Sequence, residues 1–206
     1  MDFIKYVKNS TKEYLERMLK SERIKIGQFF TPSLIAEYMG SWTNIRMNEI
    51  TILDAGAGSG ILSAALLNKM YCDGKIKKIH LDVYENNPCI LSLLDTNLAY
   101  MKTRFLDKDI LLDYKIYSKN FIVENHFAWT GIVPNQKYDI VISNPPYKKI
   151  GKNDPEARVM ENIVYGQPNL YFLFMAMAAR LLKENGEFIF ILHSRLSVTR
   201  KSLKTL

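Results

Sequence analysis

The sequence predicts an α/β fold with a mostly parallel central sheet, flanked by helices and preceded by a helical N-terminal segment. Short apolar runs such as 138–143 and 187–192 are rich in β-branched and aromatic residues and have the length of buried strands. Segments with helical periodicity lie between such runs, and strands that alternate with helices favour a parallel sheet. At 54–60 a glycine-rich turn joins a strand directly to a helix, which is typical of a nucleotide-binding crossover.

The elements can be placed in order along the chain. Helices are expected over 2–22, 33–42, 61–70, 88–101 and 170–183, and strands over 51–53, 79–84, 113–121, 138–143 and 187–192. Thr31 should cap the second helix with Pro32 at its first position, Asn87 should cap the fourth, and Asn185-Gly186 should end the last. Between them, 122–136 has no regular pattern, 148–168 has the length of a lid or substrate loop, and 194–206 is expected to be a basic tail.

Composition limits the classes of function. The chain has 206 residues, enough for one domain with a core, and 48% of them are hydrophobic. A formal net charge of +7 favours a polyanionic partner. The two cysteines and three histidines are in no metal-ligand spacing, so we expect no metal site. No apolar run reaches membrane length and no signal peptide opens the chain, so we expect a cytoplasmic protein.

The glycine-rich turn has the pattern Asp-x-Gly-x-Gly-x-Gly over 54–60, which differs from the dinucleotide pattern Gly-x-Gly-x-x-Gly. Its glycines allow the backbone to approach a ligand closely. Asp54 would repel a pyrophosphate but suits a ligand with an ammonium group, such as the methionyl part of S-adenosylmethionine. Glu85 ends the second strand, where a carboxylate can accept hydrogen bonds from both ribose hydroxyls.

The tetrapeptide Asn144-Pro145-Pro146-Tyr147 follows the strand over 138–143. Two prolines make it a stiff, extended turn at the carboxyl edge of the sheet. The side-chain oxygen of Asn144 and the carbonyl of Pro145 can accept two hydrogen bonds from a single amino group, and Tyr147 offers a stacking face for a base. The alternative is a proline-stiffened turn at a strand end with no chemical role.

Four motifs in this order resemble the adenine-N6 DNA methyltransferases of restriction–modification systems, most closely those whose cofactor motifs precede the target-recognition domain. The motifs are Gly27-Gln28-Phe29-Phe30-Thr31-Pro32, Asp54 to Gly60, Glu85 and Asn144-Pro145-Pro146-Tyr147. The resemblance implies a Rossmann-like class I methyltransferase fold that uses S-adenosylmethionine, and double-stranded DNA with a flipped adenine as substrate.

The resemblance also implies roles for individual residues. Asn144, Pro145, Pro146 and Tyr147 would hold the flipped adenine, with Asn144 also bordering the cofactor. The cofactor-binding residues would be Phe30, Thr31 and Pro32 along the pocket, Asp54, Ala55, Gly56, Gly58 and Gly60 at the methionyl part, Glu85 and Asn86 at the ribose, and Asn120 and Phe121 at the adenine ring.

Two departures from the family pattern stand out. Asn120 occupies the position where the family has an aspartate that contacts the adenine amino group of the cofactor. An amide oxygen accepts that bond without charge assistance, so we expect weaker cofactor affinity. The chain also stops where the family continues. We therefore expect residues 1–45 to form a helical segment with a cofactor motif and 46–206 a catalytic domain. The last strands of the fold and the recognition domain, or a specificity subunit, would lie outside this chain.

The mechanism expected is direct attack of the adenine amino group on the sulfonium methyl group, with positioning as the main source of acceleration. Three alternatives stay open. A protein-glutamine methyltransferase of the release-factor type also uses Asn-Pro-Pro-Tyr, although the segment 28–32 and the positive charge favour DNA. A nicotinamide-dependent dehydrogenase is disfavoured by the glycine spacing. A non-catalytic, cofactor-binding or scaffolding fragment is the third.

Overall fold

The computed structural model describes residues 2–19, 30–44, 47–192 and 197–202. Within them lies a six-stranded sheet with the order β3-β2-β1-β4-β5-β6. Neighbouring strands from β3 to β5 pair in parallel, and β6 pairs antiparallel with β5. The strands are β1 (Glu49–Ala55), β2 (Lys78–Tyr84), β3 (Leu111–Tyr117), β4 (Tyr138–Ser143), β5 (Leu182–Leu192) and β6 (Ser197–Ser202). The predicted α/β class and mostly parallel sheet are confirmed.

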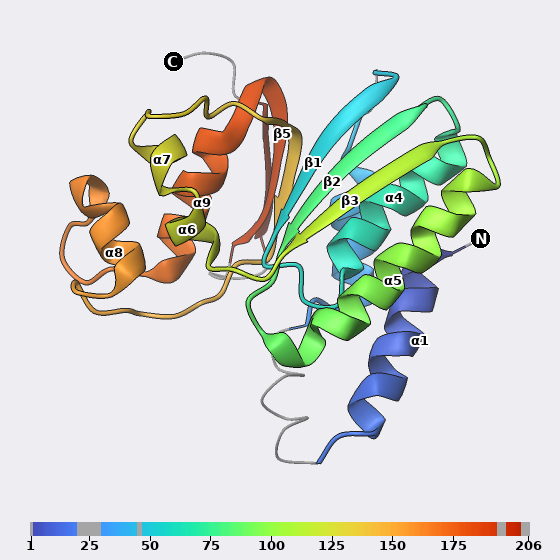
Figure 1. Ribbon diagram of the computed structural model, residues 1–206, viewed down its shortest axis with the longest axis horizontal. Helices are drawn as coiled ribbons and strands as arrows, with labels where there is room; N and C mark the ends of the chain where they lie inside the picture. The colour runs from blue at the N-terminus through green and yellow to red at the C-terminus, as the bar shows by residue number, and fades with distance from the viewer. Residues whose placement is uncertain (1, 20–29, 45–46, 193–196, 203–206) are drawn as a thin grey trace.

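Helices cover both faces of the sheet (Figure 1). One group comprises α1 (Phe3–Glu16), α3 (Ser33–Ser41), α4 (Ile61–Asp73) and α5 (Pro88–Leu106). The other comprises α6 (Phe121–Glu124), α7 (His126–Trp129), α8 (Pro155–Val159) and α9 (Leu170–Leu181), with the 3₁₀ turn η1 (Glu161–Ile163) after α8. Two hydrophobic clusters match these two layers, and strands such as β1 contribute alternate residues to each, Ile52 to one and Leu53 to the other. This burial on both faces explains the continuous apolar runs.

The order of the strands creates a switch point at the centre of the sheet. From β1 the chain moves outward through β2 to β3, and it then returns to the other side of β1 as β4. Because β1 and β4 are parallel, their carboxyl ends open at the same edge with connections that leave in opposite directions. Ligands of open α/β sheets bind in the crevice at such a point.

The N-terminal helix belongs to the same core as the sheet. Asp2 caps α1, its Oδ1 accepting a hydrogen bond from the backbone N–H of Lys5 at 2.9 Å. Phe3 and Val7 are fully buried, and the Phe3 ring packs edge-on against Tyr71 of α4. A helical segment before the sheet is thus confirmed, whereas the boundary at residue 45 stays a prediction because α1 and α3 share one cluster with α4.

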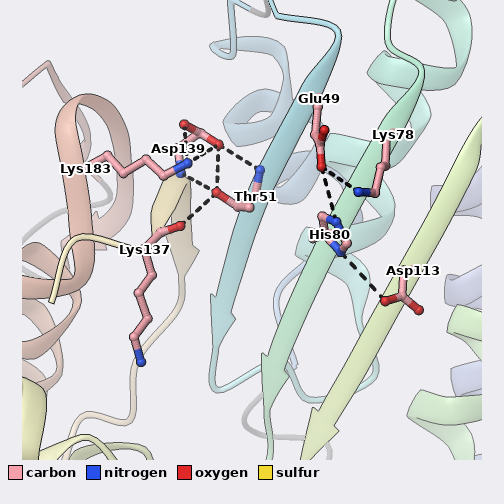
Figure 2. Close-up of polar contacts among 8 residues, drawn as sticks. All are labelled: Glu49, Thr51, Lys78, His80, Asp113, Lys137, Asp139 and Lys183. Carbon is pink, nitrogen blue, oxygen red and sulfur yellow. Dashed lines mark hydrogen bonds and ion pairs between the residues drawn. The ribbon is translucent and has the colours of Figure 1, made fainter. Parts of the chain in front are cut away.

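Polar contacts tie the strands together near their amino ends, opposite the switch point. Figure 2 shows Asp139 of β4 between Thr51 of β1 and Lys183 of β5. The Asp139 carboxylate accepts from the Thr51 N–H at 2.8 Å and from Lys183 Nζ at 3.0 Å. Burial alone would raise its pKa, but these donors outweigh burial and hold the pKa below the usual value. The contacts fix the register of three strands.

A second network on the neighbouring strands lies close to solvent. His80 of β2 lies between Glu49 of β1, at 3.4 Å, and Asp113 of β3, at 3.7 Å, as Figure 2 shows. Lys78 pairs with Glu49 at 2.7 Å. These side chains are more than a third exposed, so each pair contributes little to stability.

Several predicted boundaries are wrong. The second helix begins at Ser33, but Pro32 and not Thr31 is its N-cap, and the Thr31 hydroxyl accepts a hydrogen bond from Asn144 instead of capping the helix. The third strand ends at Tyr117 and not at Phe121, since Asn120 caps α6 instead. The segments 122–136 and 148–168 contain short helices.

The C-terminal part also differs from prediction. The chain enters β5 at Leu182, directly after α9, because Leu182 pairs with Tyr138. Asn185, with φ of 62°, therefore lies at an irregularity inside β5 and does not end a helix. Residues 197–202 are a strand and not a tail, since they pair with the edge that β5 would otherwise leave open. The predicted motif residues Gly27, Gln28 and Phe29 lie outside the described residues. Among the described helices, none has both the length and the apolar character that crossing a membrane requires.

Candidate active site

The glycine-rich turn between β1 and α4 has the backbone that its sequence predicts. Gly56, Gly58 and Gly60 have φ of 81°, 58° and 82°, in the left-handed region that disfavours residues with a Cβ. A Cβ on Gly58 would lie 3.4 Å from the Phe30 ring, and one on Gly56 would lie 3.9 Å from the Asn144 carbonyl oxygen. The turn therefore brings bare backbone to the switch point, next to residues of the first and the last predicted motif.

Glu85 lies at the end of β2 and contacts this turn. Its Oε2 accepts from the Gly58 N–H at 2.9 Å, and its Oε1 accepts from the Asn87 N–H at 2.7 Å. Burial raises the pKa of this carboxyl group, although the hydrogen bonds oppose that effect. Each oxygen has a further lone pair, so the side chain can still accept from two hydroxyl groups. Asn86, predicted beside it at the ribose, is exposed.

Asp54 takes a different position from the one expected. The side chain is fully buried, and its Oδ2 accepts from the N–H and the hydroxyl of Ser63 in α4 at 3.1 and 2.6 Å. Its Oδ1 is buried and has no hydrogen-bond partner among the described residues. Burial raises the pKa of Asp54 to about 7. With no exposed surface, the Asp54 side chain cannot contact a ligand directly.

Asn144 and its prolines form the rigid turn that the sequence predicts. The Ser143 hydroxyl donates a hydrogen bond to the carbonyl of Ala55, and this bond connects the end of β4 with the end of β1. Asn144 Nδ2 donates to Thr31 Oγ1 at 3.1 Å, whereas Asn144 Oδ1 is buried with no partner in the described part of the chain. Pro145 is buried beside it. A buried acceptor without a donor is costly unless a ligand completes it.

Tyr147 lies at the exposed end of the turn. Its ring stacks on Tyr171 of α9, with centroids 5.3 Å apart and planes 13° from parallel, and its hydroxyl donates to the Ile191 carbonyl at 3.0 Å. Burial raises the pKa of Tyr147 to about 12, while 41% of the residue stays exposed. Sequence reasoning missed Tyr171, because the predicted loop over 148–168 separates the two rings and no pattern links them.

The end of β3 is more closed than expected. Asn120 Oδ1 accepts from the N–H groups of Ile122 and Val123, and Asn120 Nδ2 donates to Glu156 of α8 at 2.6 Å. Both lone pairs of the amide oxygen are therefore committed to the start of α6. Phe121 is 2% exposed and packs against the Tyr84 ring, so it is part of the core.

A cavity of about 530 Å³ lies next to the glycine turn, between α1, the start of α3 and the start of α4. Phe30, Thr31 and Pro32 line it, together with Ser59 of the turn. From α1 it is lined by Lys8, Thr11, Lys12, Leu15 and Glu16, and further by Ser33 and Ile61. Thr31, which lines this cavity, also accepts the hydrogen bond from Asn144 Nδ2. Among the described residues, no group of three or more His, Cys, Asp or Glu side chains could hold a metal ion.

Comparison with known proteins identifies the family of this chain. Residues 59–206 match the family model described as Eco57I restriction-modification methylase. The chain belongs to this family. It is 32% identical over 199 residues to the Type II methyltransferase M.PstI of Providencia stuartii, across 93% of this chain and 36% of that protein. It is 27% identical over 157 residues to a tRNA1(Val) (adenine(37)-N6)-methyltransferase of Flavobacterium psychrophilum, across 72% and 55%.

This member of the Eco57I family has the class I methyltransferase fold. A solved class I S-adenosylmethionine-dependent methyltransferase of Listeria monocytogenes superposes with a TM-score of 0.54 at 16% identity, covering 79% of this chain and 45% of that one. The resemblance predicted from the four motifs is confirmed at the level of family and fold. The chain spans about a third of the length of M.PstI, so the activity of the whole protein is a matter for proposal.

Proposed function

We propose that this chain is the catalytic part of an S-adenosylmethionine-dependent enzyme that methylates the N6 amino group of adenine in double-stranded DNA, as the modification half of a restriction–modification system. The observation that carries this proposal is Asn144 Oδ1, which is buried without a partner among the described residues and lies beside the Pro145 carbonyl at the switch point. Membership in the Eco57I restriction-modification methylase family supports it, and so does the similarity to a relative that is named an adenine-N6 methyltransferase and acts on tRNA.

The residues present fit the cofactor. When bound, S-adenosylmethionine supplies an electrophilic methyl group and its own leaving group. The left-handed glycines at 56 and 58 leave room that a Cβ would fill. Glu85 has acceptor capacity for the ribose hydroxyls, and the charge of Asp54 suits a sulfonium and an ammonium group. Phe30 lies over Gly58, so its ring would border the bound cofactor.

The proposed role of Asn144 follows from the low nucleophilicity of an exocyclic amine. The lone pair of such an amine is delocalised into the base, so the nitrogen is planar and a poor nucleophile. Asn144 Oδ1 and the Pro145 carbonyl accept its two protons, which favours a tetrahedral nitrogen with a directed lone pair. The hydrogen bond from Nδ2 to Thr31 sets the amide plane, and the prolines prevent the turn from moving away.

Tyr147 would hold the target base. Its ring is backed by Tyr171, and stacking on a flipped base is worth about 1–3 kcal/mol. The hydroxyl is already bonded to Ile191, so the ring serves as a platform and not as an acid. The proton leaves the amine after methyl transfer, and no side chain of the turn needs to act as a strong base. Positioning of two reactants would provide most of the acceleration.

Recognition of a DNA sequence would reside elsewhere. Base readout requires an element placed in a groove, and we propose that a C-terminal recognition domain or a specificity subunit supplies it. The net charge of +7 suits contact with phosphates. Since its proposed substrate is cellular DNA, we also propose that the protein acts in the cytoplasm.

Labelled methyl transfer tests this proposal. The chain, alone and joined to the C-terminal part of M.PstI, is incubated with labelled S-adenosylmethionine and with duplex DNA, tRNA or a glutamine-containing release-factor domain. We expect label in DNA, recovered as N6-methyladenine after digestion to nucleosides, and stronger labelling with the extension. Label in the protein acceptor alone would replace the proposal with a protein-glutamine methyltransferase, and label in cytosine would contradict the role of the site.

A further inference from the structure

A carboxylate from the segment after Tyr147 lies against the end of β3. Glu156 Oε1, on α8, accepts a hydrogen bond from Asn120 Nδ2 at 2.6 Å. The Asn120 amide is oriented without ambiguity, because its oxygen accepts two backbone N–H groups of α6 at 3.1 and 3.2 Å. Asn120 therefore contacts α8 only as a hydrogen-bond donor.

The order of the strands predicts what comes to this place. The glycine turn after β1 would hold the methionyl part of the cofactor, and Glu85 after β2 would hold its ribose. Because the sheet continues from β1 through β2 to β3, the adenine ring is expected at the end of β3. The 6-amino group of adenine is a donor of two hydrogen bonds and needs an acceptor. Asn120 has none left.

We propose that Glu156, and not Asn120, accepts the hydrogen bond from the 6-amino group of the cofactor's adenine. The inference rests on the cofactor named in the proposed function. Within the described residues Glu156 Oε2 makes no hydrogen bond or ion pair, and the side chain is only partly exposed. Asn120 is then a positioning residue, which caps α6 with its oxygen and orients the Glu156 carboxylate with its nitrogen.

In this arrangement Glu156 and Asn120 together take the role of binding the 6-amino group, which the resemblance assigns to one aspartate. A carboxylate still reaches the amino group, so the bond keeps its charge assistance. The carboxylate now belongs to α8, in the segment that follows the Asn144–Tyr147 turn. The adenine ring of the cofactor and the target side of the site would thus be connected through residues 148–168.

The test compares two ligands in binding calorimetry. One is S-adenosylhomocysteine; the other is its deaminated analogue, in which a 6-oxo group replaces the 6-amino group. The wild-type chain should favour the amino form by about tenfold to a hundredfold, because a carboxylate facing an oxo group leaves two acceptors opposed. In Glu156→Gln, the Gln oxygen keeps the bond from Asn120 Nδ2 and presents its NH₂ group to the ligand. The preference should then disappear or reverse.

The matched control is Glu161→Gln, which removes the same charge from an exposed position in η1 of the same segment. It should keep the wild-type preference. If Glu156 has a purely structural role, Glu156→Gln should weaken the binding of both ligands equally. An unchanged ratio of the two affinities in Glu156→Gln would therefore overturn the inference. So would a wild-type chain that binds both ligands with equal affinity, a result that needs no variant. Failure to bind either ligand would instead remove the cofactor from the proposed function, and the inference with it.

Discussion

At the scale of single residues, the site is defined by acceptors with incomplete hydrogen bonding. Asn144 Oδ1 and Asp54 Oδ1 are both buried without a partner in the described part of the chain. The two differ in surroundings. Asn144 lies at the crevice, whereas Asp54 is enclosed between β1 and α4. A ligand can therefore reach Asn144 but not Asp54.

Asp54 should give the protein a distinct pH dependence. Its folded pKa of about 7 lies above the unfolded value, so the folded state holds a proton that the unfolded state has lost. Stability therefore falls as pH rises from about 4 to 7, by roughly 4 kcal/mol at most. Asp54→Asn cannot titrate and should lose this slope. Urea unfolding at pH 5 and pH 8 measures it, and the same loss of stability in wild type and variant would contradict the assignment.

Glu85 should matter for cofactor affinity. In Glu85→Ala the ribose hydroxyls lose their acceptor, and hydrogen bonds to charged groups contribute about 1.5–3 kcal/mol, or roughly tenfold to a hundredfold in affinity. Calorimetry with S-adenosylhomocysteine measures the loss. Glu184→Ala, which removes an exposed carboxylate of β5, should bind as the wild type does. Equal affinities of the two variants would show that the ribose lies elsewhere.

At the scale of elements, the glycine turn and the Pro-Pro turn meet because β1 and β4 are neighbours. Gly58 offers a controlled test of the close approach. With φ of 58°, Gly58→Ala should cost about 1–2 kcal/mol of stability, and its Cβ would lie 3.4 Å from the Phe30 ring. Gly74→Ala has φ of 64° and open space around the Cβ, so it carries the same backbone cost far from the site.

The two glycine variants should therefore separate in one measurement. Both should lower the free energy of unfolding by a similar amount, and only Gly58→Ala should weaken binding of S-adenosylhomocysteine. If the two bind it equally well, the turn does not contact the cofactor.

The elements also show how far sequence reasoning reaches. The strands β1, β2, β4 and the apolar core of β5 were predictable, because a strand that is buried on both faces has a continuous run of apolar residues. The end of β3 was not. Only Ser118 and Lys119, with no Gly or Pro, separate the end of the strand from Asn120, and it is the hydrogen bonds of Asn120 that show that it begins a helix. Strand β6 was missed because its basic residues gave no strand pattern, while its pairing depends on an edge 5 to 15 positions earlier.

The same contrast holds for the site. Asn144, Glu85 and the glycines were predictable because each follows a strand and the ends of parallel strands converge. Contacts from the segment 148–168 and from α9 were not, since nothing in the spacing of Glu156 or Tyr171 shows which face it meets.

At the scale of the whole molecule, the net charge of +7 predicts how the chain would bind the proposed DNA substrate. Binding carried by phosphate contacts should be indifferent to sequence, with a dissociation constant of roughly 10⁻⁴ to 10⁻⁶ M at physiological salt. Fluorescence titrations with two duplexes of equal length and different sequence, at 50 and 200 mM salt, measure it. We expect equal affinities that fall steeply with salt. Tight, salt-resistant binding to one duplex would show that this chain reads bases itself.

In the proposed reaction, Asn144 activates the adenine amino group. The most direct measurement is single-turnover methyl transfer at low salt to a duplex with a mispaired adenine, which is easier to flip and so lessens the need for a recognition domain. Asn144→Ala should slow transfer about a hundredfold or more, as loss of a transition-state hydrogen bond does, with cofactor affinity nearly unchanged. Asn48→Ala, an exposed amide at the opposite edge of the sheet, should react as the wild type does. If Asn144→Ala forms N6-methyladenine as fast as the wild type does, Asn144 does not activate the amino group.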